Sequence, residues 1–162
     1  MLNDKTFADL ITTQTSQQLI KDYNTRIGDF VSVSTPDGSA TTWTQAAHRL
    51  FTVTGTVMAR VFGVVTETIT GAATAEVGVA GATACFIAQL SNAGTLAAGD
   101  IFINATTATA LPAGALSDYT VVTDIDIDLK TASANVTNGA ITFYCQWIPV
   151  SVGAKVVAAL WD

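Results

Sequence analysis

The chain has 162 residues, enough for one domain with a substantial hydrophobic core. Only 12% of the residues are charged, about half the share of a typical soluble domain, and the net charge is −6. Nucleic-acid binding relies on Lys and Arg to displace counterions, so this acidic balance argues against a nucleic-acid partner. No run of 18 apolar residues occurs, which excludes a membrane-spanning helix, and the first residues lack the pattern of a secretory signal.

Residues 1–48 differ in pattern from the rest of the chain, and we expect an N-terminal segment there and a β-sandwich body over residues 49–162. Threonines dilute a weak helical stripe near the start of this segment, and the stripe includes Phe7, Leu10 and Ile11. The pattern predicts either a short helix packed on its own sheet or an extended arm that packs on a neighbouring molecule.

The second half of the N-terminal segment predicts a strand followed by a turn. Residues 30–34 alternate between apolar residues and serine, and a Thr-Pro-Asp-Gly turn signal follows at 35–38. Trp43 then stands alone in a small, polar stretch. It fits either a plug at the edge of the core or an anchor for an interface.

From Leu50 the pattern is strongly β. β-branched residues dominate residues 50–70, and the odd positions from Phe51 to Gly63 predict one apolar face. Gly55 and Gly63 mark bends, bulges or close packing within this run. Further strands are expected at 83–90, with Cys85 and Ile87 on the face opposite Phe86, and at 101–104.

The last third of the sequence contains the clearest alternation. Residues 124–129 alternate between Asp and Ile or Leu, which predicts a strand with three outward carboxylates. Asn138-Gly139 favours a type I′ hairpin before the next strand at 141–147. Residues 155–160 fit either a short helix or an edge strand.

Seven or eight short strands separated by turn chemistry predict an all-β fold. The spacing is typical of an antiparallel β-sandwich or jelly-roll-like domain, with the N-terminal segment as an arm or short helix.

Three aspartates form the most distinctive polar pattern, namely Asp124, Asp126 and Asp128. On a strand they would project from one face at intervals of about 6–7 Å. Three interpretations stand: a solvated face that resists edge pairing, a site for a hard cation such as Ca²⁺, and an acidic docking face for a basic partner. The Gly turn and distal Glu of a calcium-binding EF-hand loop are missing, and we expect no metal.

No motif in the chain points to catalysis, and we expect neither an enzyme nor a cofactor. His48 is the only histidine, so a Cys/His zinc site is not available within one chain. No Gly-x-Ser-x-Gly elbow and no phosphate-binding loop occur. Cys85 and Cys145 lie far apart in apolar runs and are expected as buried small hydrophobes, although a disulfide between facing strands remains open.

Three stretches carry a resemblance to a known group of proteins. The run from Phe51 to Thr68, the run Glu76–Gly81 and the run Phe143–Trp147 look like a block found in small proteins of tailed bacteriophages. The resemblance implies a β-rich virion structural protein of the head decoration (cement) type. It also implies assembly into the virion, the major capsid protein as partner, and stabilisation of the shell at capsomer junctions.

A low-charge, apolar chain would bury extra surface between copies, so we expect a homo-oligomer, with a trimer favoured. In the decoration role, the N-terminal arm and loop edges would grip the shell. The alternatives are a tail or fibre module that stacks a host glycan on exposed aromatic side chains, and a tail-tube protein. The stacking candidates are Trp43, Tyr119 and Trp161, and Trp161 is also a candidate interface residue, like Trp43.

Overall fold

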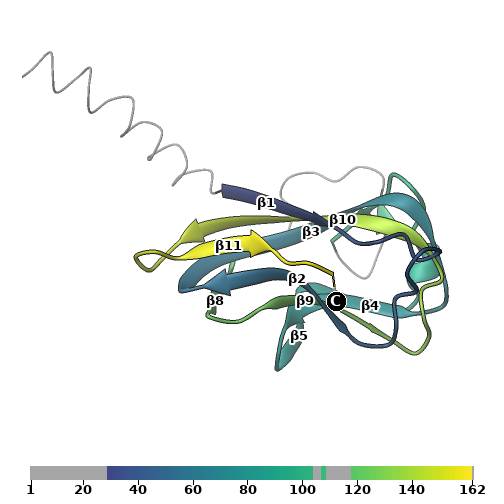
Figure 1. The fold of residues 1–162 in the computed structure, drawn as a ribbon, viewed down its shortest axis with the longest axis horizontal. Coiled ribbons are helices and arrows are strands. Elements are labelled where there is room, and N and C mark those ends of the chain that lie inside the picture. The colour runs from purple at the N-terminus through teal and green to yellow at the C-terminus, as the bar shows by residue number, and fades with distance from the viewer. Residues whose placement is uncertain (1–28, 104–106, 109–117, 162) are drawn as a thin grey trace, which may run out of the picture.

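Two antiparallel sheets pack face to face in the computed structural model, which describes residues 29–103, 107–108 and 118–161 (Figure 1). The first sheet has the order β1-β10-β3-β6-β7, and β8 also pairs with β3. Its strands are β1 (Asp29–Ser34), β10 (Asn138–Pro149), β3 (Thr56–Thr70), β6 (Ile101–Phe102), β7 (Thr107–Ala108) and β8 (Thr120–Thr123). The predicted all-β sandwich is therefore confirmed.

The second sheet has the order β11-β2-β9-β4-β5. Its strands are β11 (Lys155–Ala158), β2 (Ala47–Thr54), β9 (Ile127–Ala132), β4 (Thr74–Val79) and β5 (Ala82–Leu90). A single 3-10 turn, η1 (Ala93–Thr95), follows β5. No helix in the described part of the chain is long and apolar enough to cross a membrane.

The core lies between the inner faces of the two sheets, as the odd-numbered alternation predicts. The odd residues of β3 from Val57 to Val65 and those of β10 from Ile141 to Trp147 are all buried. The second sheet contributes Phe51, Ile127 and Leu129, which are fully buried. Period-two patterning therefore decides which face of each strand is removed from water.

A tight turn divides the long β run at Gly55. Gly55 has φ +69°, a conformation that favours glycine, and it links β2 of the second sheet to β3 of the first. Asp124 also has a positive φ, of +47°, and its carboxylate accepts a hydrogen bond of 2.6 Å from the backbone N–H of Gly55. The predicted strand over 124–129 is therefore too long, because Asp124 lies in a bend and β9 begins at Ile127.

The Asn138-Gly139 pair forms a bulge rather than the predicted hairpin. β9 and β10 belong to different sheets, so the connection between them crosses the sandwich. Gly139 has φ +101°, and the β10–β3 register shifts on both sides of Ala140. A Cβ at Gly139 would lie 2.5 Å from the carbonyl oxygen of Thr68, so close packing requires glycine here.

Several local predictions are confirmed at the ends of the described chain. β1 covers the strand expected at 30–34, and a turn follows it in which Ser39 donates from its hydroxyl and its N–H to the Asp37 carboxylate. These bonds lower the pKa of Asp37.

The last strand, β11, is an edge strand, which was one of the two alternatives predicted for residues 155–160. The boundary expected between the N-terminal segment and the body, at residues 48/49, falls inside β2.

Candidate functional site

A large patch of the outer face of the first sheet is apolar and aromatic, and we call this patch the aromatic face. Even-numbered residues of β3 and β10 point away from the core and meet side chains of β1 and β8 in register. The face consists of Phe30, Met58, Arg60, Phe62, Tyr119, Val121, Tyr144, Gln146 and Ile148. Phe30 is 58% exposed and Val121 is 62% exposed, so two strands hold large apolar side chains in water.

Arg60 is the charged member of the aromatic face and is held at its centre. Its Nε donates a 2.6 Å hydrogen bond to Oε1 of Gln146, which is only 5% exposed. Its guanidinium lies 5.0 Å from the centre of the Tyr119 ring, in cation–π geometry. The register places Phe30, Gln146 and Arg60 side by side across three strands. The guanidinium is therefore fixed in position rather than free to sample solvent.

A second aromatic pair extends the face along β3 and β10. Phe62 and Tyr144 stack with ring centres 5.2 Å apart and an interplanar angle of 16°. Both rings are partly exposed. Stacked rings expose a flat apolar surface with little side-chain freedom left to lose, which favours contact with a partner.

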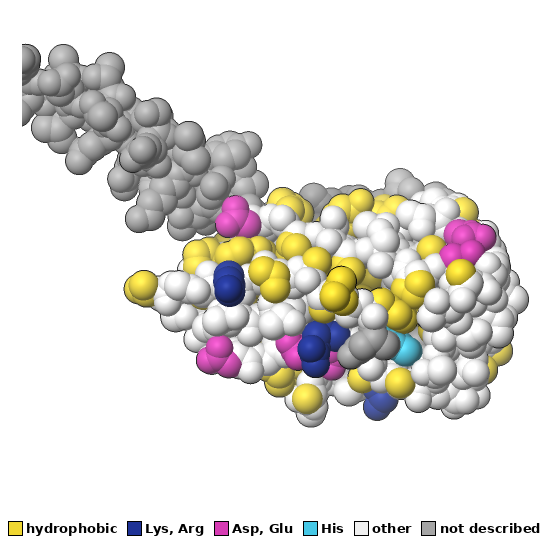
Figure 2. Space-filling view, in the orientation of Figure 1, with side chains coloured by type: hydrophobic (Ala, Val, Ile, Leu, Met, Phe, Trp, Pro, Cys, Tyr) yellow, Lys and Arg dark blue, Asp and Glu magenta, His cyan; other side chains and the backbone are white. Residues whose placement is uncertain are grey.

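The outer face of the second sheet carries charges of both signs, and we call it the charged face. Arg49 forms a 2.8 Å ion pair with Asp126, and Asp128 is the direct cross-strand neighbour of Arg49. Lys130 lies opposite Glu76 on the adjacent strand. Figure 2 shows hydrophobic side chains gathered along β1, whereas acidic and basic side chains lie next to one another over β2.

The three predicted aspartates have different surroundings. Asp124 bonds to Gly55 in a bend, Asp126 pairs with Arg49, and Asp128 has Arg49 and Lys130 as neighbours on its face. Alternation in the sequence cannot reveal these partners, because they come from β2 and from the turn before β3. Among the described residues, no group of His, Cys, Asp and Glu is arranged to hold a metal ion.

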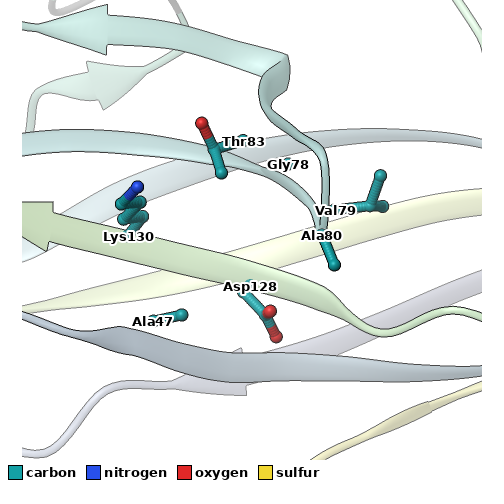
Figure 3. Close-up of a pocket in the computed structure, with 7 residues that line it drawn as sticks. All are labelled: Ala47, Gly78, Val79, Ala80, Thr83, Asp128 and Lys130. Atoms are coloured by element: carbon teal, nitrogen blue, oxygen red, sulfur yellow. The ribbon is translucent and has the colours of Figure 1, made fainter.

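A small pocket lies on the charged face. Figure 3 shows Asp128 and Lys130 on β9, between Ala47 of β2 and the β4–β5 hairpin. The pocket has a volume of about 160 Å³, and its other lining residues are Gly78, Val79, Ala80 and Thr83. Pockets for small-molecule ligands usually measure about 300–1,000 Å³. This one suits a few water molecules or a single small group better than a substrate.

Trp43 and Trp161 belong to a packed aromatic cluster around His48. Trp43 is 1% exposed, and its indole N–H donates to the carbonyl of Pro36 over 2.9 Å. Trp161 lies 5.6 Å from the Trp43 ring and stacks on the buried His48 at 4.5 Å. The core alternative therefore holds for Trp43, and its interface alternative is wrong because the ring is not accessible. Trp161 is partly exposed, and its stacking on His48 holds the C-terminal segment against β2.

The two cysteines are free rather than paired. Cys145 lies in the core of the first sheet, and burial raises the pKa of its thiol to about 12. Cys85 on β5 is partly buried, and desolvation raises its pKa as well. A reactive cysteine needs a lowered pKa, so neither thiol resembles a catalytic nucleophile.

Sequence reasoning missed the residues of the aromatic face. The signal was present, since Phe62 and Tyr144 stand at even positions in strands whose odd positions are apolar. Aromatic side chains on both faces of a strand indicate that the second face is also covered or used. The interface candidates Phe7, Leu10 and Ile11 lie outside the described residues.

No family model, curated protein or solved structure matches this chain.

Proposed function

We propose that the protein is a non-enzymatic virion structural protein of the bacteriophage head decoration type, which binds the major capsid protein and stabilises the shell. The observation that supports this proposal is the aromatic face. The face is broad because β1, β10 and β3 lie side by side, and β8 extends it.

The composition of the aromatic face is that of a protein–protein contact. The centres of such contacts are rich in Tyr, Phe, Met and Arg and poor in Lys, Glu and Asp. The aromatic face has this bias, with Arg60 already desolvated in part by Gln146 and Tyr119. A held guanidinium loses little side-chain entropy on docking, so it suits a carbonyl or carboxylate of a capsid subunit.

The glycan-binding alternative has less support. It depended on exposed tryptophans beside carboxylates, whereas Trp43 is buried and Trp161 is stacked on His48. Tyr119 faces the guanidinium of Arg60. Asp126, the acidic side chain with an ion pair, lies on the charged face and is paired with Arg49.

The proposal is tested by co-sedimentation of the purified protein with empty heads of its parent phage. Wild-type protein is expected to sediment with the heads and to raise the temperature at which they open. Val121→Asp places a charge at the 62% exposed position of the aromatic face and is expected to weaken binding at least about tenfold.

Val152→Asp is the matched control, because Val152 is fully exposed on the loop between β10 and β11, outside the aromatic face. It is expected to bind like wild type. Failure of the wild-type protein to bind heads would contradict the decoration role, and binding to tails or glycans instead would favour the alternatives. Equal loss in both variants would exclude the aromatic face as the contact.

A further inference from the structure

We propose that β1 is a docking edge for a second copy of this chain, and that two β1 strands pair antiparallel about a two-fold axis. This inference stands independently of the virion role, because it depends only on the edge strand of the first sheet. The two first sheets would join into one continuous sheet.

β1 has one paired side and one open side. In the described part of the chain it is the terminal strand of the first sheet, and its partner is β10. The N–H of Thr35 donates to the carbonyl of Ile141 over 2.9 Å, which fixes the phase of the β1–β10 ladder. Because hydrogen-bonded and non-hydrogen-bonded residues alternate, Val31 and Val33 bond to β10. The backbone N–H and C=O groups of Phe30, Ser32 and Ser34 therefore point away from the sheet.

The residues on the open side are also the exposed ones. Phe30, Ser32 and Ser34 are exposed, and the Phe30 ring is 58% exposed. Val31 and Val33 are only partly buried, although their side chains pack against the core. A second strand at this edge would satisfy the free backbone groups and complete the burial of both valines.

The other sheet edges carry features that discourage pairing. β7 has two residues, while β8 and β11 have four each, and β11 begins with Lys155. β5 has nine residues, but its register with β4 shifts twice. Short strands, lysines and bulges are the devices by which proteins protect sheet edges.

β1 lacks every one of these protections. It pairs with β10 over six consecutive residues without a bulge, and it contains neither Lys nor Pro. Its one charge is Asp29, at the start. An exposed, regular edge of this length is a template for another strand, and the two-fold form is self-complementary.

One register fits the side chains of two β1 strands. With Ser32 opposite Ser32 of the second copy, Phe30 faces Ser34 on the outer side, and Val31 faces Val33 on the inner side. The outward backbone groups then meet as hydrogen-bonded pairs, and no two carboxylates face each other. Because the axis runs through the sheet, both aromatic faces lie on the same side of the dimer.

Light scattering after size exclusion tests the pairing on the full chain. Wild type is expected at twice 16.8 kDa. Ser32→Pro removes the outward N–H while leaving the bonds of Val31 and Val33 to β10, so it is expected to be a folded monomer. Ser32→Ala keeps that N–H and is expected to remain dimeric. A wild-type monomer, a trimer, or a Ser32→Pro dimer would overturn the pairing.

Cross-linking decides the register without relying on a proline variant. Ser32→Cys should form an intermolecular disulfide on mild oxidation, since hydrogen-bonded strand pairs have a Cα–Cα distance of about 5.5 Å. Ala88→Cys, an exposed position on the edge strand β5, is the control and should not cross-link above the wild-type background from Cys85. Equal cross-linking of the two variants would overturn the proposal.

Discussion

The two sheets of the sandwich bury similar apolar faces inward but differ in their outer faces and in their regularity. The first sheet has a ladder between β10 and β3 that is unbroken from Ile141 to Pro149, and its outer face is aromatic. The second sheet has charged pairs outside, and its β4–β5 ladder shifts register twice. Packing therefore constrains the two inner faces alike, whereas it leaves the two outer faces free to differ in composition.

The largest expected difference between the two sheets is in the unfolding free energy that is lost when a glycine is replaced by alanine. A Cβ at Gly78 of β4 would lie 2.2 Å from the backbone oxygen of Ala82, so Gly78→Ala must displace the hairpin. A Cβ at Gly63 of β3 would lie 2.8 Å from the Cγ2 methyl of Ile141 and 3.1 Å from the Phe143 ring, so its close contacts are with side chains rather than with backbone. We expect Gly78→Ala to cost more than about 3 kcal/mol and Gly63→Ala about 1–2 kcal/mol in urea unfolding. Equal costs would contradict the difference between the sheets.

The two cysteines sharpen the comparison by their reactivity. Burial raises the pKa of Cys145 to about 12 and shields its thiol, so at pH 8 it should react with a thiol reagent far more slowly than the partly buried Cys85 on the second sheet. A raised folded-state pKa stabilises the protein below the unfolded value of 9.0, and that stability is lost as the pH rises towards 12. Labelling monitored by mass spectrometry and alkaline urea titrations measure both effects. Cys145→Ala should flatten the alkaline decline.

The smallest expected difference in stability is between substitutions of two arginines, one on each outer face. Arg60→Met removes a donor to the buried Gln146 and a cation–π contact, and should destabilise the fold by about 1–3 kcal/mol. Arg49→Met removes an exposed ion pair to Asp126 and should cost about 0.2–1 kcal/mol. The cost of Arg49→Met should shrink in high salt, while that of Arg60→Met should persist. Thermal unfolding at two ionic strengths measures this difference, and an inverse order would contradict it.

The sequence predicts the inner faces well and the outer faces poorly. Val57 and Val61 are found buried as expected, because local alternation records burial directly. At β5 the same rule fails, since Phe86 and Ile87 are both buried where register shifts interrupt the alternation. Alternation is a local property, whereas a bulge depends on the strand opposite.

The aromatic face could not be assembled from the sequence for a related reason. Phe30 and Arg60 lie on either side of Gln146 on one face because β10 lies between β1 and β3, and no local pattern contains that strand order. The aspartate pattern, by contrast, predicted a regular strand where the structure has a bend. Asp124 fits an alternating strand by residue type, but its carboxylate is used to close the turn at Gly55.

The pairing of β1 with β10 has a consequence for the order of events on the ribosome. The hydroxyls of Ser34 and Thr142 that meet across this pair are 108 residues apart. At about 5–20 residues per second, β1 is synthesised roughly 5 to 20 s before its partner strand. During this interval both edges of β1 lack a partner strand. Nascent chains lie close together on a polysome, so this is the time at which chaperones are most needed to prevent pairing between chains.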